Sequence, residues 1–156
     1  MPIAFQKMNA NGDDFVIVDL RGQGHDPAHR VDRDLVRRIG GRHRGIGSNP
    51  LAVGSDCDDA AARVAFRNPD GSALDTCGSA TRGVAWKKLM RGTGAASVVP
   101  RTNRGRLHCS HDTDGLIEVE MGAPRLGWQD VTVRWNDAGS VFLSVPVTFG
   151  FNGAWL

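Results

Sequence analysis

One stretch of the sequence has the pattern of a substantial helix, and short strand-like runs separated by turn signals surround it. The helix is predicted over Ser79–Met90, where apolar residues supply one face and basic residues gather near the end. A shorter helix is predicted over about 34–39, with Asp32 as its N-cap and Gly40-Gly41 as its stop. Strands and helices do not alternate regularly, which argues against a doubly wound parallel sheet. The expected fold class is therefore α+β.

The strand-like runs are bounded by residues typical of tight turns. Asn11-Gly12 is a strong signal for a two-residue hairpin turn. Within Asn68–Gly71 (NPDG), the proline presets φ and the glycine tolerates the left-handed region, which indicates another turn. The strands are predicted at Ala4–Met8, Phe15–Leu20, Leu51–Val53, Arg63–Arg67, Ala96–Pro100, Gly105–Ser110, Leu116–Met121, Val131–Trp135 and Val141–Val147.

The length and charge of the chain exclude several broad classes of protein. With 156 residues the chain is long enough for one domain with a real core. Its net charge of +2 is too small to indicate a nucleic-acid partner. No apolar run reaches the roughly 18 residues of a membrane helix, so no membrane partner is expected. The first residues lack the pattern of a signal peptide, and a cytoplasmic location is expected.

The three cysteines, Cys57, Cys77 and Cys109, are odd in number and irregular in spacing, so no disulfide framework is expected. Cys77-Gly78 opens the predicted main helix, where backbone N–H groups and the helix dipole stabilise negative charge. Such placement can lower a thiol pKa from about 8.5 to roughly 3.5–7.5. First-turn N–H groups could also bind a carboxylate. This arrangement suits chemistry on the α-carbon of an amino acid, and a small cysteine that packs a helix start is the alternative.

The segment around Cys77 resembles a motif of the diaminopimelate epimerase family. That motif reads N-A-D-G-S-E, then a few residues, then C-G-N-[AG]-x-R. The corresponding segment, Asn68–Trp86, reads NPDGSALDTCGSATRGVAW. The resemblance extends to the opening of the chain, because KMNANGDDFVIVD at Lys7–Asp19 is similar to the family's K-M-x-G-x-G-N-D-F.

Three further segments follow the family pattern in the same order. RHRGIGSNPL at Arg42–Leu51 is similar to R-H-x-G-[IV]-G-x-D-Q-L. RTNRGRL at Arg101–Leu107 and VEMGAPR at Val119–Arg125 resemble comparable strands of the family. The match covers roughly Phe5 to Asp130, and five segments in register are much more specific than any one of them.

The resemblance implies a fold of two similar α+β domains, each a strand-rich mixed or antiparallel sheet wrapped around one central helix, with the active site between them. It implies conversion of LL-2,6-diaminopimelate to the meso form for lysine and cell-wall synthesis, with no cofactor and no metal. One cysteine, as a thiolate, removes the α-proton, and another, as a thiol, reprotonates the opposite face. Cys77 matches one of these cysteines, Gly78 matches the glycine beside it, and Asn68 matches a residue that hydrogen-bonds the substrate.

The chain departs from the family pattern at three polar positions. Asp13 stands where the opening motif has asparagine, Pro50 replaces a glutamine, and Ser79 replaces the asparagine after Cys-Gly. Each missing hydrogen-bond partner costs on the order of 1–3 kcal/mol. The residues assigned to the site are catalytic Cys77 and the substrate-binding set Asp13, Asn68, Gly78 and Ser79.

The expected amino-terminal domain spans residues 1–130, and the family's second domain, with its own cysteine motif, is absent. Residues 131–156 are expected to form a β-rich tail without family resemblance. The ending VTFGFNGAWL is apolar, so we expect it to pack back on the domain or against a partner.

Three hypotheses about function remain. The first is an epimerase-family chain that supplies one cysteine and is incomplete alone. The second is an active homodimer, in which two Cys77 thiols face each other. The third is a non-enzymatic remnant or binding module that keeps the fold. Half of a related proline or hydroxyproline racemase is a further alternative, and in each enzymatic case the partner is a small amino-acid substrate.

Metal ligands are not expected. His25 and His29 are four residues apart, but the residues between them indicate a loop rather than a helix face. His108, Cys109 and His111 lie on a predicted strand, where Cys109 faces away from His108.

Overall fold

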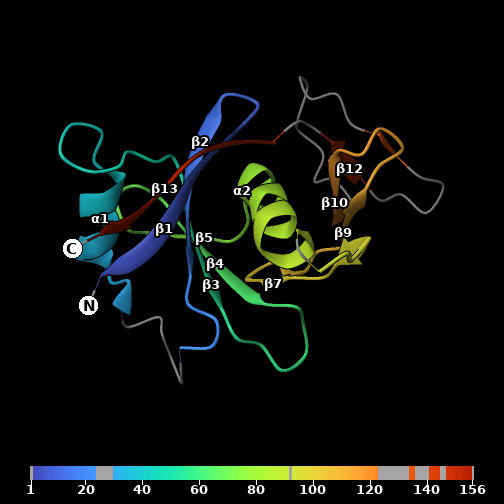
Figure 1. The fold of residues 1–156 in the computed structure, drawn as a ribbon, viewed down its shortest axis with the longest axis horizontal. Helices are drawn as coiled ribbons and strands as arrows, with labels where there is room; N and C mark the ends of the chain where they lie inside the picture. The colour runs from blue at the N-terminus through green and yellow to red at the C-terminus, as the bar shows by residue number, and fades with distance from the viewer. Residues whose placement is uncertain are drawn as a thin grey trace.

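The computed structural model describes residues 2–23, 30–91, 93–122, 134–135, 141–144 and 147–155. In these residues the strands form two sheets, and one helical segment lies between them (Figure 1). The α+β class and the strand-rich sheet wrapped around a central helix, both predicted above, are confirmed. None of the described helices is long and apolar enough to cross a membrane.

The larger sheet is mixed. Its β2–β3 and β4–β7 pairs are parallel, and its other pairs are antiparallel. In spatial order the strands are β13 (Val147–Trp155), β1 (Ile3–Ala10), β2 (Asp13–Asp19), β3 (Leu51–Ser55), β4 (Arg63–Arg67), β7 (Arg101–Thr102) and β8 (Gly105–Arg106), with β5 (Ala73–Leu74) paired to β4.

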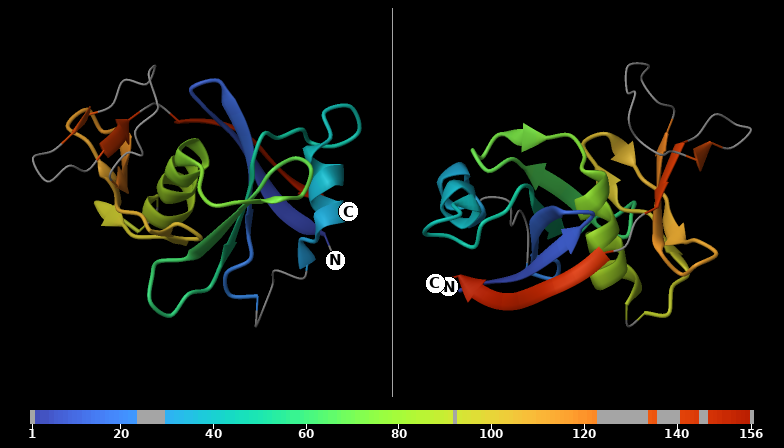
Figure 2. Two further views of the ribbon diagram at one scale, coloured as in Figure 1. Left: turned by 180° about the vertical axis from the view of Figure 1, so that it is seen from behind. Right: turned by 90° about the horizontal axis from the view of Figure 1, so that it is seen from above.

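The smaller sheet is antiparallel throughout its described residues. Its order is β11 (Arg134–Trp135), β12 (Val141–Ser144), β10 (Ile117–Gly122), β9 (Cys109–His111) and β6 (Ser97–Val98). It faces the central helix from the side opposite the larger sheet (Figure 2).

The central helix consists of α2 (Gly78–Val84) followed without interruption by a π-helical segment, η2 (Ala85–Met90). It begins one residue before the predicted start and ends at the predicted residue. Gly83 allows the helix to lie close to β2, because a Cβ at this position would stand 2.4 Å from Phe15 Cε2. Phe15 is completely buried in the resulting helix–sheet core.

Strand β2 is buried on both faces. Phe15 and Ile17 point into the core under α2, whereas Val16 and Val18 point into a second core. The second core is covered by α1 (Arg33–Gly40). The alternation places Asp13 on the α2 side of β2 and Asp14 on the other side.

The local signals read from the sequence are confirmed where the structure describes them. Asp32 caps α1 by accepting a hydrogen bond from Leu35 N at 2.8 Å. Asn11 and Gly12 both have positive φ values, 55° and 79°, as the hairpin turn between β1 and β2 requires. Gly71 N donates to Asn68 O at 2.8 Å and closes the NPDG turn.

Two predicted strands are shorter or divided. The run 96–100 forms only β6, and the run 105–110 is split between β8 in the larger sheet and β9 in the smaller one. Pro100 has no N–H to donate to a ladder, and its carbonyl instead accepts from Leu107 N at 3.0 Å. The chain therefore turns between the two sheets here, which the local pattern did not reveal.

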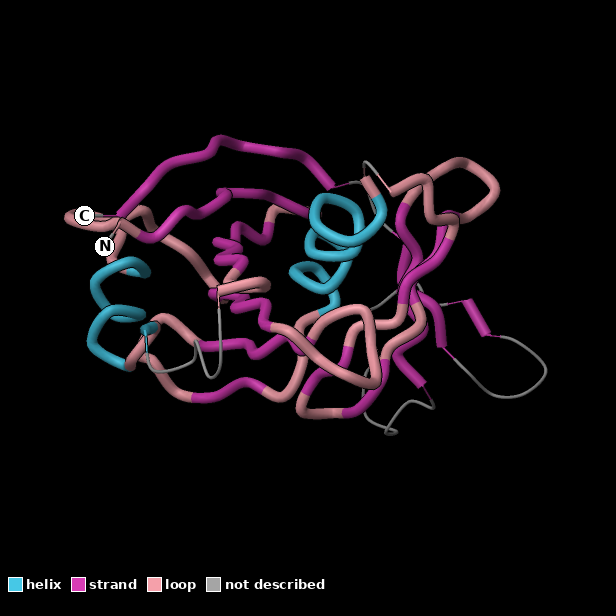
Figure 3. The backbone as a smooth tube through the Cα atoms, turned by 60° about the horizontal axis from the view of Figure 1, so that its bottom comes forward, coloured by secondary structure: helices cyan, strands magenta, loops and turns pink. Residues whose placement is uncertain are grey.

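The apolar ending packs back on the domain. Strand β13 pairs with β1 along its length, from Ile3↔Trp155 to Ala10↔Val147, so the two ends of the chain lie side by side (Figure 3). Phe149 packs on the first core and Trp155 on the second, whereas Phe151 is 49% exposed. The histidines at positions 25 and 29 lie outside the described residues.

Candidate active site

Cys77 occupies the N-cap position of α2. Its backbone is extended, with φ −141° and ψ 114°, and its carbonyl accepts the first helical hydrogen bond from Thr81 N at 2.8 Å. The expected geometry, a cysteine at the start of the central helix, is therefore present. The side chain is half-buried and packs at the edge of the first core.

The sulfur of Cys77 has anion-stabilising and anion-repelling neighbours. Burial is the largest influence and raises the thiol pKa. The backbone N–H of Ala80 lowers the pKa, the carboxylate of Asp13 raises it, and the N–H of Ser79 and the charge of Arg82 lower it. The net pKa is raised, so the expectation that the helix start would lower it is wrong. Burial and a carboxylate from a distant strand outweigh the local helix effect.

Asp13 connects Cys77 to a loop from another part of the chain. One carboxylate oxygen, Oδ2, lies 3.9 Å from Cys77 Sγ. The other, Oδ1, accepts a hydrogen bond from Asn49 Nδ2 at 2.7 Å. Asn49 is itself held by a 2.7 Å bond from its backbone N–H to the Asp14 carbonyl. The carboxylate of Asp13 is thus fixed between the thiol and the 42–49 loop.

Arg82 places a buried cation one turn into the helix. Its side chain is only 1% exposed, and Nη2 lies 3.4 Å from Ser79 Oγ. Burial lowers the pKa of the guanidinium, and the charges of Cys77, Asp13 and Cys109 raise it. Arg82 was not among the predicted site residues, although it matches the arginine that ends the C-G-N-[AG]-x-R pattern. That final letter was the signal that could have identified it.

The structure brings together Asp13, Cys77, Gly78 and Ser79, four of the five predicted site residues. Asn68, the fifth, bonds within its own turn, where Nδ2 donates to Ser72 Oγ at 2.9 Å. Asn49 was missed. It stands where the quoted family pattern has aspartate, and Asp13 stands where the pattern has asparagine, so the exchange of these two letters was the available signal.

The residue that precedes Cys77 in the sequence carries a buried hydroxyl. Thr76 Oγ1 is buried and has no hydrogen-bond partner among the residues with described placement. Buried hydroxyls in folded proteins are nearly always bonded.

Asp14, on the opposite face of β2, anchors the same loop by ion pairs. Lys7 Nζ lies 2.5 Å from Oδ2, and Arg42 bonds both carboxylate oxygens at 2.7 and 3.1 Å. Lys7 also donates to the carbonyl of Gly47. The hydrogen bond from Arg42 is the main cause that lowers the Asp14 pKa to about 2.

Replacement of Asp14 by Asn should make the free energy of unfolding depend less on pH in the acid range. Because the folded-state pKa is depressed, the stabilisation is present above the unfolded value near 4 and is lost as pH falls through about 2. We expect Asp14→Asn to lose about 1–2 kcal/mol at pH 7, since the pair is partly exposed, and almost nothing at pH 2. Urea unfolding between pH 7 and pH 2 measures this. Equal losses at both pH values would contradict it, and Asp75→Asn, at an exposed carboxylate, is the control.

The other two thiols are in different environments. Cys109 is buried, its Sγ lies 3.7 Å from Leu107 O, and burial raises its pKa to about 12. Cys57 lies on the surface side, 3.0 Å from Asp59 Oδ1. His111, two residues from Cys109, bonds the Gly115 carbonyl through Nδ1 at 3.1 Å. No group of three metal-ligating side chains occurs within the described ranges.

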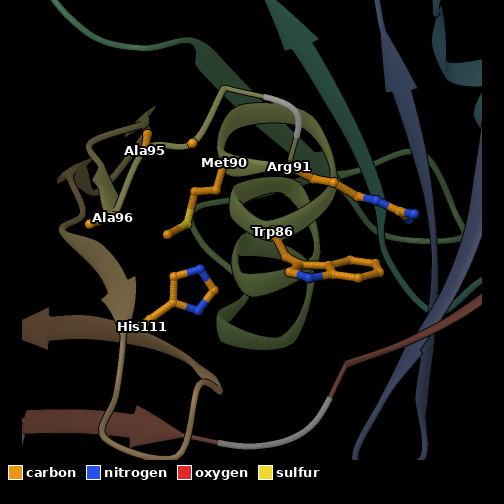
Figure 4. A pocket seen from close by; sticks show the side chains of 7 residues that line it. Trp86, Met90, Arg91, Ala95, Ala96 and His111 are labelled. Atoms are coloured by element: carbon orange, nitrogen blue, oxygen red, sulfur yellow. The ribbon is translucent and has the colours of Figure 1, made fainter.

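A pocket of about 600 Å³ lies at the other end of the central helix from Cys77. Met90 and His111 point toward one another across it, while the side chains of Trp86 and Arg91 extend away from them on the other side of the helix (Figure 4). The Arg91 guanidinium stands 5.4 Å from the centre of the Trp86 ring. This pocket is separate from the Asp13–Cys77 contact.

Comparisons with known proteins identify relatives of the chain. The family model described as diaminopimelate epimerase matches residues 5–127. The chain is 42% identical over 128 residues to a diaminopimelate epimerase of Acidiphilium cryptum and 38% identical over 127 residues to that of Phenylobacterium zucineum. Each alignment covers 81% of this chain and 44% of the relative, so the chain spans about half the length of the curated relatives it matches.

The fold has relatives at lower identity. A phenazine biosynthesis protein of the PhzF family from Bacillus anthracis superimposes with a TM-score of 0.57 at 22% identity, over 80% of this chain and 42% of that protein. The match of the family model over most of the sequence, together with the identities to the two epimerases, establishes the relationship. The chain belongs to the diaminopimelate epimerase family.

Proposed function

We propose that residues 1–130 form one half of a cofactor-independent epimerase site, which inverts the α-carbon of diaminopimelate with Cys77 as one of two acid–base groups. The observation that carries this proposal is the position of Cys77 in a family member. The thiol stands at the start of the central helix. The N–H groups of Ser79 and Ala80 lower its pKa and so favour an anion on the sulfur.

The surroundings of Cys77 suit proton transfer at an α-carbon. An α-proton next to a carboxylate is only weakly acidic, so acid and base must be held on opposite faces in a site with little water. Cys77 is half-buried, and Arg82 places a buried positive charge near it. A thiolate formed during the reaction is stabilised by this charge and by the first-turn N–H groups.

The second acid–base group is proposed to come from outside residues 1–130. One thiol reaches one face of a substrate, and the relatives are about twice as long as the aligned segment. A second copy of the chain is the alternative source of that group, and a strictly monomeric mass by sedimentation would exclude it.

The test is α-proton exchange on LL-diaminopimelate in deuterated water, followed by NMR. We expect no exchange by the chain alone. We expect exchange by a chimera that joins the whole chain, with β13 in place, to the carboxy-terminal part of the Acidiphilium cryptum relative. Cys77→Ser in the chimera should lower the rate by 10²–10⁴-fold, the usual range for a general acid or base. Cys57→Ser makes the same change at a surface-side thiol and should leave the rate unchanged.

Two outcomes would overturn parts of this proposal. Exchange by the isolated chain that is abolished by Cys77→Ser would show that the half is sufficient. A folded chimera in which Cys77→Ser has no effect on exchange would remove the catalytic role of Cys77. Proline and hydroxyproline serve as alternative substrates in the same assay, which tests the racemase alternative.

A binding module is the second candidate function. Three changes at expected substrate contacts, Asp13, Pro50 and Ser79, favour it. The Pro50 carbonyl accepts a hydrogen bond from Val16 N at 3.2 Å, so this residue is part of the sheet edge. Binding of diaminopimelate by the chain in calorimetry, combined with an inactive chimera, would favour this alternative.

A further inference from the structure

The contact between Asp13 and Cys77 assigns a direction to the proton transfer. We propose that Asp13 holds Cys77 in the neutral thiol form, so that Cys77 enters the reaction as the acid that donates a proton to the substrate carbon, and acts as the base only when the reaction runs in reverse. The first part concerns the free protein. The second part rests on the proposed function.

The geometry favours a thiol over a thiolate at this position. Asp13 Oδ2 lies 3.9 Å from Cys77 Sγ, a distance at which an S–H group can donate to the carboxylate. A thiolate would instead face a like charge in a half-buried setting, where water screens it poorly. Ionisation of Cys77 is therefore opposed by its neighbour on β2.

Asn49 keeps the Asp13 carboxylate in this orientation. Its side-chain amide occupies Oδ1 at 2.7 Å and leaves Oδ2 for the sulfur. Its backbone N–H is bound to the Asp14 carbonyl, and the ion pairs of Asp14 with Lys7 and Arg42 hold the same loop. Asp13 is thus a positioning residue with two fixed contacts and not a free surface carboxylate.

Groups on the central helix allow Cys77 to give up its proton and to regain it. The N–H groups of Ser79 and Ala80 and the charge of Arg82 stabilise an anion on the same sulfur. In the donation step the S–H bond of Cys77 breaks, a C–H bond forms at the α-carbon, and the carbanion electron pair becomes that bond. The resulting thiolate is held by the helix N–H groups until solvent returns a proton to it.

The first test follows alkylation of Cys77 by neutral iodoacetamide against pH, with peptide mass spectrometry to separate the three cysteines. Asp13→Asn should raise the rate at pH 7.5 by roughly three- to tenfold, because more of the thiol ionises. Asp75→Asn removes an exposed carboxylate two residues from Cys77 and should not change the rate. The buried Cys109 should stay unmodified in all variants.

A charge-conserving variant guards against loss of folding. The double variant Asp13→Asn, Asn49→Asp keeps the amide–carboxylate pair and the net charge. It moves the carboxylate from position 13, beside the sulfur, to position 49 in the loop. Cys77 in this double variant should be alkylated as fast as in Asp13→Asn. An unchanged or slower rate in either folded variant would overturn the proposal. If neither variant folds, a wild-type Cys77 pKa at or below that of free cysteine would overturn it.

The second test uses the pH profile of the chimera and addresses the donor role. The high-pH limb of kcat/KM reports the acid of the free enzyme. Asp13→Asn should move that limb to lower pH and leave the low-pH limb in place. Movement of the low-pH limb instead would identify Cys77 as the base. The alkylation test needs no substrate, so failure of the proposed function and failure of the Asp13 inference are distinguished.

Discussion

Replacement of Phe15 by alanine is expected to lower the free energy of unfolding by about 3–5 kcal/mol. The ring is completely buried between β2 and the central helix, where it packs with Met8, Phe66 and Val84. Its removal leaves a cavity that the helix can close only in part. Urea denaturation gives the loss, and the same change at the half-exposed Phe151 is the control. Similar losses at the two positions would contradict the placement of Phe15.

Gly83 provides a second variant that tests the same contact. A methyl group at this position would meet Phe15 Cε2 at 2.4 Å and Cζ at 2.6 Å, so Gly83→Ala should cost about 1–3 kcal/mol by overpacking. In the double variant with Phe15→Ala the methyl group enters the vacated space. The two losses should therefore sum to more than the loss in the double variant. Strict additivity would show that the helix and β2 are not in contact here.

Removal of residues 147–156 is expected to abolish cooperative folding. Strand β13 covers the whole edge of β1, and its Phe149 and Trp155 pack on both cores. The loss should equal most of the roughly 5–15 kcal/mol that holds a domain of ordinary stability together. The exposed edge of β1 would pair with other molecules, so the truncated chain should accumulate in the insoluble fraction.

Thermal unfolding and the soluble fraction after expression measure this effect. A chain that lacks only Leu156 is the matched control, because its last described residue still pairs with Ile3. A truncated chain that remains soluble and unfolds in one sharp transition would contradict the structural role of β13.

The features that follow from neighbouring residues were predictable from the sequence. The Asp32 cap, the Asn11-Gly12 turn and the closed turn at Asn68–Gly71 are each determined by two to four adjacent residues. The helix start beside Cys77 belongs to this group as well, and so does its position at the N-cap. Such signals act over one turn of chain and do not depend on the rest of the fold.

The features that depend on distant residues were not predictable from these local signals. Asp13 lies 64 positions from Cys77 in sequence, yet its carboxylate and the burial of the thiol reverse the expected direction of the pKa shift. The division of the 96–110 region between two sheets depends on which sheet edge is free, and the pairing of β13 with β1 depends on chain ends that no local pattern connects.

Arg82 and Asn49 were missed by the sequence analysis for a different reason. Both positions were present in the compared motifs, but each side chain becomes meaningful only through a contact across the fold. A buried arginine is uncommon because the loss of hydration is costly, so the burial of Arg82, which depends on the whole fold, marks it as part of the site.

The pairing of β1 with β13 also has a consequence for the kinetics of folding. One edge of β1 gains its neighbour only when the opposite end of the chain arrives, so this ladder closes the largest loop in the molecule. Folding rates fall as the mean sequence separation of contacts rises. The hairpin of β1 and β2 can form early from local contacts, whereas the strand that shields it is added late. The interval between these two events is when the chain is most exposed to misassociation with other copies.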